Sequence, residues 1–438
     1  MSNGKEYYER VFQLLKKHHA LFRSTIPLIA SENVPSPAVR EAIITDFGNR
    51  YAEGWPGKRV YAGCTYIDQV ELLCIELAKK LFNAEFVDVR PISGVVANLA
   101  VYTAFTDPGD YMLALSIPSG GHISMGKKRF GGTAGAVHGL NVEYLALDHK
   151  ELNVDVDETI RRVEELAKTE KTPRLVMFGG SVLPFPHPVR EMEEYLHNLG
   201  VTVAYDAAHV AGLIAGETFQ DPLREGADVV TLSTHKTLPG PQHGMILSLE
   251  KHAERIKKAT FPGVVSNHHL HNMAGVAVAL AEMLEFGRKY AKQIISNAKA
   301  LGQALYERGF KVLAEHKGFT ESHVLLVDII EYGDGGEIEK QLEKANIIIN
   351  RNLLPWDIQE GRHYMNPGGI RLGTSEITRL GMEEKEMEEI AEFIKRVIVE
   401  KEPSEKVKKD VAEFRKNFQK VHFCFDKLRD AYEYIEIR

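Results

Sequence analysis

The feature that most constrains the fold is a regular alternation of short apolar runs with longer amphipathic segments between residues 70 and 250. The apolar runs are rich in β-branched residues, as buried strands are, whereas the segments between them carry apolar residues at helical spacing. The expected strands are 86–89, 111–116, 174–178, 201–206 and 227–232, and the expected helices are 68–82, 93–105 and 189–199. Strands that alternate with helices form a parallel sheet with right-handed crossovers. We therefore expect an α/β fold with a mostly parallel central sheet.

The two ends of the chain differ from this central pattern. Residues 6–22 and 38–47 are expected to form helices separated by Pro35 and Pro37. Beyond the central region we expect two long helices, then a mixture of strands and helices, over 274–288, 290–308, 324–329, 336–344, 345–349, 369–373, 383–400 and 405–418. A chain of 438 residues can hold more than one domain. The predicted parts are an N-terminal helical arm (1–45), a large domain (46–275) and a smaller C-terminal α+β domain (276–438).

Composition excludes several classes of protein. The formal charge of −7 argues against a generic nucleic-acid surface. No apolar run reaches the length needed to span a membrane, and residues 1–19 lack the apolar core of a signal peptide. The three cysteines, Cys64, Cys74 and Cys424, show no paired metal spacing and cannot build a disulfide framework. We expect a cytoplasmic protein without a membrane or nucleic-acid partner.

A lysine follows the last of the expected central strands. Lys236 comes after the apolar run 227–232 and before a Pro-Gly-Pro turn, so it is expected on a tight loop at a strand exit. A lysine in such a place can form a Schiff base if burial or a nearby cation lowers its pKa. The adjacent Thr234 and His235 could line the same site. The alternative is an ordinary surface lysine in a tight loop.

A carboxylate at another strand end favours the Schiff-base interpretation. Asp206 ends the apolar run 201–206, thirty residues before Lys236. Pyridoxal phosphate (PLP) acts as an electron sink only while its ring nitrogen stays protonated, and a carboxylate partner keeps it so. The alternative is an aspartate that simply ends a strand at a turn.

The region around Lys236 resembles the PLP-lysine motif of the serine hydroxymethyltransferase family. Six further stretches resemble the family in the same order and cover nearly the whole chain: Leu-Ile-Ala-Ser-Glu-Asn (28–33), Tyr-Ala-Glu-Gly (51–54), Pro-Gly-Lys-Arg (56–59), Gly-Gly-His (120–122), Asp-Ala-Ala-His-Val-Ala-Gly (206–212) and Gly-Ile-Arg-Leu-Gly-Thr (369–374). Details at 178–181, 185–188 and 261–267 are closer to the archaeal branch. Each stretch alone is weak evidence, but the ordered set is specific.

This resemblance implies a fold-type I (aspartate aminotransferase-like) homodimer that binds PLP. The implied reaction is the reversible transfer of the hydroxymethyl group of serine to a reduced pterin, tetrahydrofolate or tetrahydromethanopterin, giving glycine. Lys236 would bind PLP, Asp206 would pair with its ring nitrogen, and His122 would stack on its ring. Arg371 would hold the substrate carboxylate, since an arginine can make two parallel hydrogen bonds to it.

The resemblance also implies roles for residues in loops. Glu53 would be the acid/base group, and Tyr51 and Tyr61 would lie near the substrate. These residues would enter the site from the neighbouring subunit. Ser31 would also bind substrate. The implied PLP contacts are Ser93, Gly94, His122, Ser181, Asp206, His209, Thr234, His235, Lys236 and Gly263, and the implied pterin contacts are Ile117, Gly121, His122, Ile123 and Asn352. Ser93 and Gly94 also suit a phosphate by position, because a Ser-Gly turn that opens a helix offers free backbone N–H groups.

Plain structural roles remain open for these residues taken one at a time: a helix cap for Ser93, a solvated carboxylate for Glu53, a turn residue for His122 and a sheet-edge arginine for Arg371. The chain departs from the bacterial pattern at 264–268, where a glycine-rich loop is replaced. His268, His269 and His271 there have no acidic or cysteine companions, so we expect no metal site.

Two other functions remain open from the sequence. A pterin-independent PLP aldolase acting on 3-hydroxy amino acids would share the lysine, aspartate and arginine, but it need not keep the pterin-facing loops. A non-catalytic binding protein would need neither Lys236, Asp206 nor Glu53, and the presence of all three weighs against it.

Overall fold

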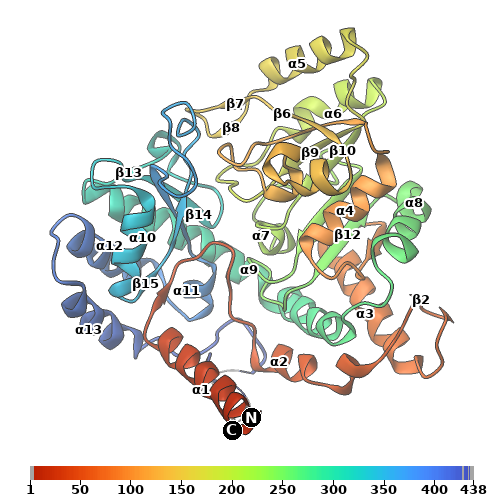
Figure 1. Cartoon of the computed structure of the whole chain (residues 1–438). Coiled ribbons are helices and arrows are strands. Elements are labelled where there is room, and N and C mark those ends of the chain that lie inside the picture. Colours follow the sequence, from red (N-terminus) through yellow and green to blue (C-terminus); the bar gives the residue numbers. More distant parts are fainter. Residues whose placement is uncertain (1–3, 427–428, 433, 435–438) are drawn as a thin grey trace.

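A seven-stranded sheet forms the centre of the protein (Figure 1), seen here in a computed structural model that describes residues 4–426, 429–432 and 434. In spatial order its strands are β4 (Phe86–Asp88), β12 (Gly244–Ser248), β11 (Val229–Ser233), β10 (Thr202–Asp206), β9 (Leu175–Gly179), β5 (Tyr111–Ala114) and β6 (Asn141–Tyr144). Only β12 runs antiparallel to its neighbours. The prediction of a mostly parallel central sheet is confirmed.

The sheet is buried on both faces, which explains why its strands are continuous apolar runs. Along β9, Val176 and Phe178 belong to one hydrophobic cluster, whereas Leu175 and Met177 belong to another. Successive residues of a strand point to opposite faces, so the two clusters lie on the two sides of the sheet. The helices of this region are α3 (Thr65–Phe82), α4 (Gly94–Phe105), α5 (Val156–Lys168), α6 (Val189–Asn198), α7 (Ala211–Ala215) and α8 (Ala253–Lys258).

A second, smaller sheet carries the C-terminal part of the chain. Its antiparallel order is β13 (Lys311–Val312), β14 (Val324–Asp328), β17 (Gly369–Gly373) and β16 (Asn350–Asn352). The helices around it are α10 (Gly335–Lys344), α11 (Ser375–Arg379), α12 (Glu384–Ile398) and α13 (Ser404–Arg415). A separate hydrophobic cluster fills this part, as expected for a smaller α+β unit.

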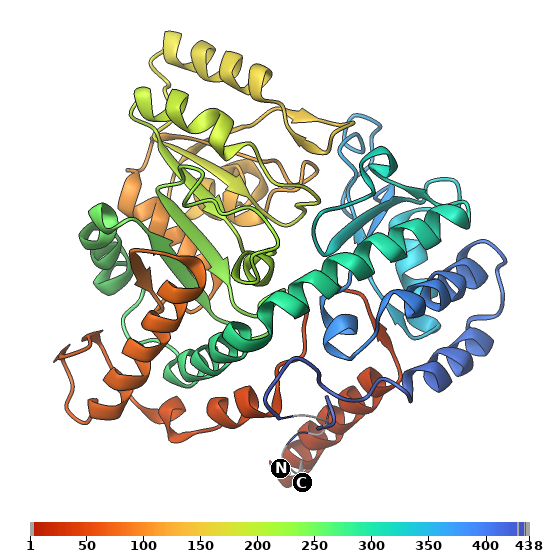
Figure 2. The same cartoon turned by 180° about the vertical axis from the view of Figure 1, so that it is seen from behind.

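One long helix connects the two sheets. The prediction of two helices, 274–288 and 290–308, is wrong, because α9 (Leu270–Glu307) is continuous over 38 residues. Figure 2 shows it in the foreground, running from below the central sheet to the small sheet. Lys289, at the predicted break, is a good helix former, and no proline interrupts the helix. The predicted boundary between large and small domains, at 275/276, lies inside α9.

The N-terminal arm begins with α1 (Gly4–Arg23), in which no residue is buried. The chain then rises between the two sheets before it reaches α2 (Pro37–Ile43) (Figure 1). On the way, β1 (Ile26–Pro27) pairs in parallel with β15 (Ile347–Ile348). The remaining short strands form two hairpins, β2 (Gly54–Trp55) with β3 (Lys58–Arg59) and β7 (Leu147–Asp148) with β8 (Asn153–Val154). No helix of the described residues has the length and apolar character that crossing a bilayer requires.

Candidate active site

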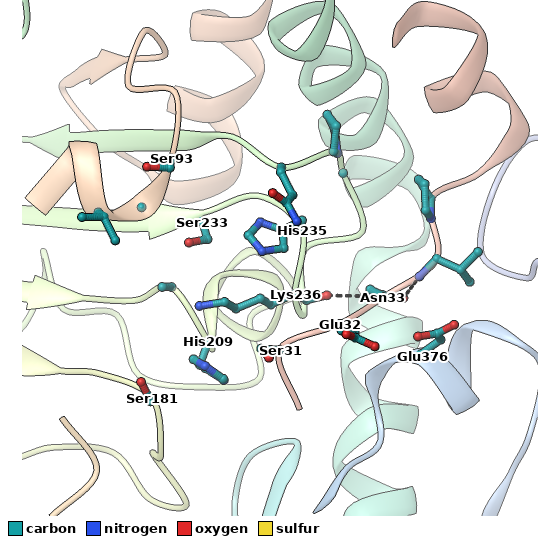
Figure 3. Close-up of a pocket in the computed structure, with 18 of the residues that line it drawn as sticks. Ser31, Glu32, Asn33, Ser93, Ser181, His209, Ser233, His235, Lys236 and Glu376 are labelled. Carbon is teal, nitrogen blue, oxygen red and sulfur yellow. Dashed lines mark hydrogen bonds between the residues drawn. The ribbon is translucent and has the colours of Figure 1, made fainter. Parts of the chain in front are cut away.

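A cavity of about 770 Å³ lies where the carboxyl ends of the central strands meet the small sheet. The loops that follow β9, β10 and β11 line it together with the start of α4, the segment before α2, and Arg371 of β17. In open α/β sheets this edge is the usual place for a ligand. Figure 3 shows Lys236 reaching into the cavity, with Ser93 and Ser233 on one side and Ser181 and His209 on the other.

Lys236 is half-buried at the wall of this cavity, on a loop held by local hydrogen bonds. The Thr234 hydroxyl donates to the carbonyl oxygen of Pro241 at 2.6 Å, and the Thr237 hydroxyl donates to that of His209 at 2.8 Å. Burial lowers the pKa of Lys236 to about 8, with Asp206 opposing and Arg371 adding to this shift. An amine with a pKa of about 8 is roughly one-tenth neutral at pH 7, and this neutral form can attack an aldehyde.

Thr234 and His235, which precede Lys236 in the sequence, differ in whether they line the cavity. His235 lines the cavity, and burial lowers its pKa to about 4, so its ring is neutral. Thr234, expected to contact the cofactor, uses its hydroxyl within the loop and does not line the cavity.

Asp206 is fixed by a network of buried polar side chains. Its Oδ2 accepts from Asn98 Nδ2 at 2.8 Å, and its Oδ1 accepts from the backbone N–H of Ala208 at 2.9 Å. Asn98 is itself fixed, because its Oδ1 accepts from the Thr231 hydroxyl at 2.6 Å. The carboxylate can therefore present a defined edge to a protonated ring nitrogen in the cavity.

His122 belongs to the same network. Its Nδ1 lies 2.8 Å from the hydroxyl of Ser124, which also accepts from Asn98 Nδ2 at 2.9 Å. Burial lowers the pKa of His122, so the imidazole is neutral near pH 7 and can stack on a flat heteroaromatic ring. Asn98 joins His122 to Asp206, yet it is not among the predicted site residues; its only sequence signal is its place in the helix that Ser93 opens.

The start of α4 forms one end of the cavity. Ser93 is the N-cap of this helix, and its Oγ accepts from the N–H of Val96 at 3.2 Å. Ser93, Gly94 and Val95 line the cavity, as does Ser233. A side chain at position 94 would collide with the hydroxyl of Ser233, so glycine is needed where α4 meets β11. Free N–H groups at a helix N-terminus suit a phosphate.

PLP fits this set of residues. The N-terminus of α4 and Asp206 line the same cavity as Lys236, whose pKa is lowered to about 8. These three features match a phosphate, a basic ring nitrogen and an aldehyde, the groups that PLP presents.

Arg371 enters the cavity from the small sheet. Its Nη1 donates to the carbonyl oxygen of Ser181 at 3.0 Å, and its Nε donates to Asn350 Oδ1 at 3.1 Å. The residue is 9% exposed, and burial lowers its pKa to about 10. Among the residues that the structure describes, no carboxylate forms an ion pair with it. A buried cation without an anionic partner is costly, so this position suits a substrate carboxylate.

Other predicted contacts also line the cavity, namely Ser31, Ser181 and His209. His209 Nδ1 lies 3.3 Å from Nε2 of His323, and burial lowers the pKa of His209 well below its usual range.

The predicted acid/base group lies elsewhere in this chain. Glu53 accepts a hydrogen bond from the Ser266 hydroxyl and does not line the cavity that contains Lys236. Tyr51 and Tyr61 contact each other with ring centroids 5.2 Å apart and are 53% and 45% exposed. Gly263, in η6 (Ala259–Val264), is also absent from the cavity wall. A single chain does not bring these four residues to Lys236.

The predicted pterin contacts are dispersed in a single chain. His122 lines the cavity, whereas Ile117 and Ile123 are exposed on the surface near it. Gly121 packs against the carbonyl oxygen of Leu115, where any side chain would collide. Asn352 lines a small neighbouring pocket together with Ser119 and Gly120.

The end of the cavity away from the Lys236 amine contains residues that the sequence did not indicate. Glu376 and Glu32 lie there (Figure 3), and the Tyr432 hydroxyl donates to Glu376 at 2.9 Å. Burial raises the pKa of Glu376 to about 7. Glu32 and Asn33 belong to the Ser-Glu-Asn stretch, but nothing local marks Glu376 or Tyr432 as cavity residues, because they meet only through the tertiary fold.

Among the histidines at 268–271, His268 takes part in a buried cluster of charged side chains. His268 is buried with its Nε2 3.3 Å from Glu71 Oε2, and Glu71 also pairs with Arg59 at 2.5 Å. Within the described ranges no group of three or more histidine, cysteine, aspartate or glutamate side chains could hold a metal ion.

Comparison with known proteins agrees with this geometry. The family model described as serine hydroxymethyltransferase matches residues 5–394. The chain is 62% identical to the serine hydroxymethyltransferase of Nitrosopumilus maritimus, over 100% of this chain and 99% of that protein. It is 56% identical to the corresponding protein of Methanocaldococcus jannaschii, over 96% of each. The chain therefore belongs to the serine hydroxymethyltransferase family, PLP-dependent fold-type I enzymes that convert serine to glycine and pass the one-carbon unit to a pterin carrier.

Proposed function

We propose that the cavity described above is the catalytic site and that Lys236 is the residue that binds PLP. The observation that carries this proposal is that three side chains line one cavity: Lys236, whose pKa is lowered to about 8, Asp206, and the buried Arg371. When bound, PLP supplies the electron sink that cleavage of the serine Cα–Cβ bond requires. Asp206 holds the proton on the ring nitrogen, and His122 covers a face of the ring.

The proposed substrate position follows from the same geometry. Arg371 binds the α-carboxylate of serine, and Ser31 lies on the wall of the same cavity. Ser93, Gly94 and Ser233 receive the phosphate, with Ser181, His209 and His235 around the ring. This arrangement orients the amino group of serine toward Lys236.

We further propose that two copies of the chain form a homodimer in which each copy completes the site of the other. Two apolar surfaces are exposed. The first is the apolar side of α1, with Tyr7, Tyr8, Val11, Leu14 and Leu15, and the second is the aromatic loop that contains Glu53, with Tyr51, Val60, Tyr61 and Tyr66. Clustered exposed apolar side chains mark interaction sites. Glu53, with Tyr51, Tyr61 and Gly263, then reaches the partner's cavity, and Glu53 moves a proton at the hydroxymethyl group or at the carrier.

The carrier is proposed to be tetrahydrofolate or tetrahydromethanopterin, bound near Ile117, Gly121, Ile123 and Asn352. Tetrahydromethanopterin is included because the similar relatives, such as those of Methanocaldococcus jannaschii and Methanothermobacter marburgensis, are archaeal. The division into arm, large domain and small domain, and a location in the cytoplasm, remain part of the proposal.

An absorbance titration tests this function and identifies the carrier. The PLP-loaded protein is titrated with glycine, and tetrahydrofolate or tetrahydromethanopterin is added in parallel. A long-wavelength band that one pterin strongly enhances reports removal of the glycine Cα proton and names that carrier. Bound PLP whose spectrum neither pterin changes would favour the pterin-independent aldolase, and no PLP binding at all would favour a non-catalytic protein.

A further inference from the structure

The segment Ile26–Val34 connects the two halves of the site. At one end it is bound to the C-terminal part of the chain: β1 pairs with β15 in a separate two-stranded sheet, and the N–H of Gly373, the last residue of β17, donates to the carbonyl oxygen of Leu28 at 2.8 Å. At its other end it reaches the loop that contains Lys236 (Figure 3). The segment therefore touches both the strand that carries Arg371 and the loop that carries the lysine.

Asn33 makes the contact with the lysine loop. Its Nδ2 donates to the carbonyl oxygen of Lys236 at 2.6 Å and to the hydroxyl oxygen of Tyr290 at 2.8 Å. Its Oδ1 accepts from the N–H of Val34 at 2.9 Å. Both N–H donors and the carbonyl oxygen of the amide are thus used, so the side chain has one defined orientation.

Tyr290 extends this connection to the small sheet. Its hydroxyl donates to the carbonyl oxygen of Ser375 at 2.8 Å, four residues beyond Arg371. Burial raises the pKa of Tyr290, so the phenol stays protonated and remains a donor. A continuous hydrogen-bonded path therefore runs from the main chain of Lys236 through Asn33 and Tyr290 to Ser375, the first residue of α11, which follows the strand that carries Arg371.

We propose that Asn33 and Tyr290 are positioning residues that fix the spacing between Lys236 and Arg371. This inference rests on the proposed roles of the lysine and the arginine. Lys236 follows a strand of the central sheet whereas Arg371 lies on a strand of the small sheet, and one serine molecule must engage both side chains. The bond to the Lys236 carbonyl restrains the main chain and leaves the side-chain amine free to move.

The alternative is that Asn33 and Tyr290 merely stabilise the fold. Both interpretations predict that removing Asn33 lowers the melting temperature, since buried polar groups would lose their partners. They differ in what happens to the surroundings of the lysine amine. Only a positioning role predicts a change in the titration of the PLP–lysine bond and in the use of serine.

The test compares Asn33→Ala and Tyr290→Phe with Ser36→Ala. Ser36 is the N-cap of α2 and lies three residues after Asn33, and its Oγ accepts from the N–H of Val39 at 3.2 Å, a bond within the cap of α2. Three quantities are measured on PLP-loaded protein: the melting temperature, the pH midpoint of the PLP absorbance, and kcat and KM for serine.

Positioning predicts that Asn33→Ala shifts the absorbance midpoint and lowers kcat/KM about 100-fold, the order expected for misplacing reacting groups by about 1 Å. Tyr290→Phe keeps the bond to Lys236 and should lower kcat/KM about tenfold, with a smaller shift of the midpoint. Ser36→Ala should lower only the melting temperature.

An unshifted midpoint and a kcat/KM within about twofold of wild type in Asn33→Ala would overturn the inference. If that variant does not fold, Tyr290→Phe decides the question by the same criteria, because it removes a single oxygen atom. Lys236→Ala separates this outcome from a failure of the proposed function. A wild-type PLP band that persists in Lys236→Ala contradicts the role of the lysine itself, whatever Asn33 does.

Discussion

At the scale of single residues, the chemistry depends on opposed charges around the half-buried amine of Lys236. Burial lowers the pKa of Lys236 to about 8; the negative Asp206 raises it and the positive Arg371 lowers it further. These effects make predictions of opposite sign for two substitutions in one cavity.

The neutral amine captures PLP, so the capture rate of the PLP-free protein should rise with pH through about 8. Asp206→Asn removes the charge that favours the protonated amine, so its profile should move to lower pH. Arg371→Gln removes the charge that disfavours it, so its profile should move to higher pH. Stopped-flow absorbance across about pH 6–10 measures these midpoints, and movement of both variants in the same direction would contradict the assignment.

At the scale of elements, the contact between α4 and β11 shapes the phosphate end of the site. The backbone of Gly94 is not left-handed, so its conformation does not itself require glycine. A methyl group at position 94 would nevertheless collide with the Ser233 hydroxyl, although it would lie at an ordinary contact distance of 3.6 Å from the Ser233 Cβ. Overpacking of this kind costs about 1–3 kcal/mol. Gly94→Ala should therefore weaken PLP binding about 10- to 100-fold.

The double variant Gly94→Ala, Ser233→Ala should recover part of this affinity, because it removes the colliding hydroxyl. Ser233→Ala alone measures what the hydroxyl contributes to PLP binding, and equilibrium dialysis gives the four affinities. Losses that simply add in the double variant would show that the two side chains do not interact.

The helix α1 allows a prediction about assembly. Leu14 is 55% exposed on its apolar side, and Gln13 lies on its polar side. Burying a leucine contributes about 1.5–3 kcal/mol, and a two-fold interface contains it twice. Leu14→Glu should raise the dimer dissociation constant at least about 100-fold in sedimentation equilibrium, whereas Gln13→Glu should not. Equal effects of the two variants would place the interface elsewhere.

At the scale of the whole molecule, the proposed site needs two chains. Lys236→Ala and Glu53→Gln should each be inactive as homodimers, but a heterodimer has one site with both groups intact. Random pairing of co-expressed chains makes half the dimers mixed, so the preparation should regain about a quarter of wild-type activity.

A matched pair tests the geometry of this recovery. Lys236→Ala mixed with Asp206→Asn should recover nothing, because both residues serve the same chain's cavity and each site of the heterodimer stays defective. Recovery in this second mixture, or none in the first, would contradict the shared site.

The sequence by itself determined the parallel sheet and most of the residues around Lys236. Strand and helix periodicities are local, and parallel strands bring their carboxyl ends to one edge, so local patterns are enough to place Lys236 and Asp206 together, whereas Ser181 was expected only from the family resemblance. The prediction of a break within α9 is wrong, because tertiary contacts along both sheets stabilise one continuous helix.

Only the tertiary structure brought together Asn98, Asn33, Tyr290 and Glu376, whose neighbours are far away in the sequence. A buried amide or carboxyl is defined by its hydrogen-bond partners, and no local pattern contains them. The tertiary structure also showed that Glu53 and its tyrosines lie outside their own chain's cavity, since exposure and reach depend on how separate elements pack. Local periodicity therefore specified the sheet and the order of its chemistry, whereas long-range packing fixed the distances over which that chemistry acts.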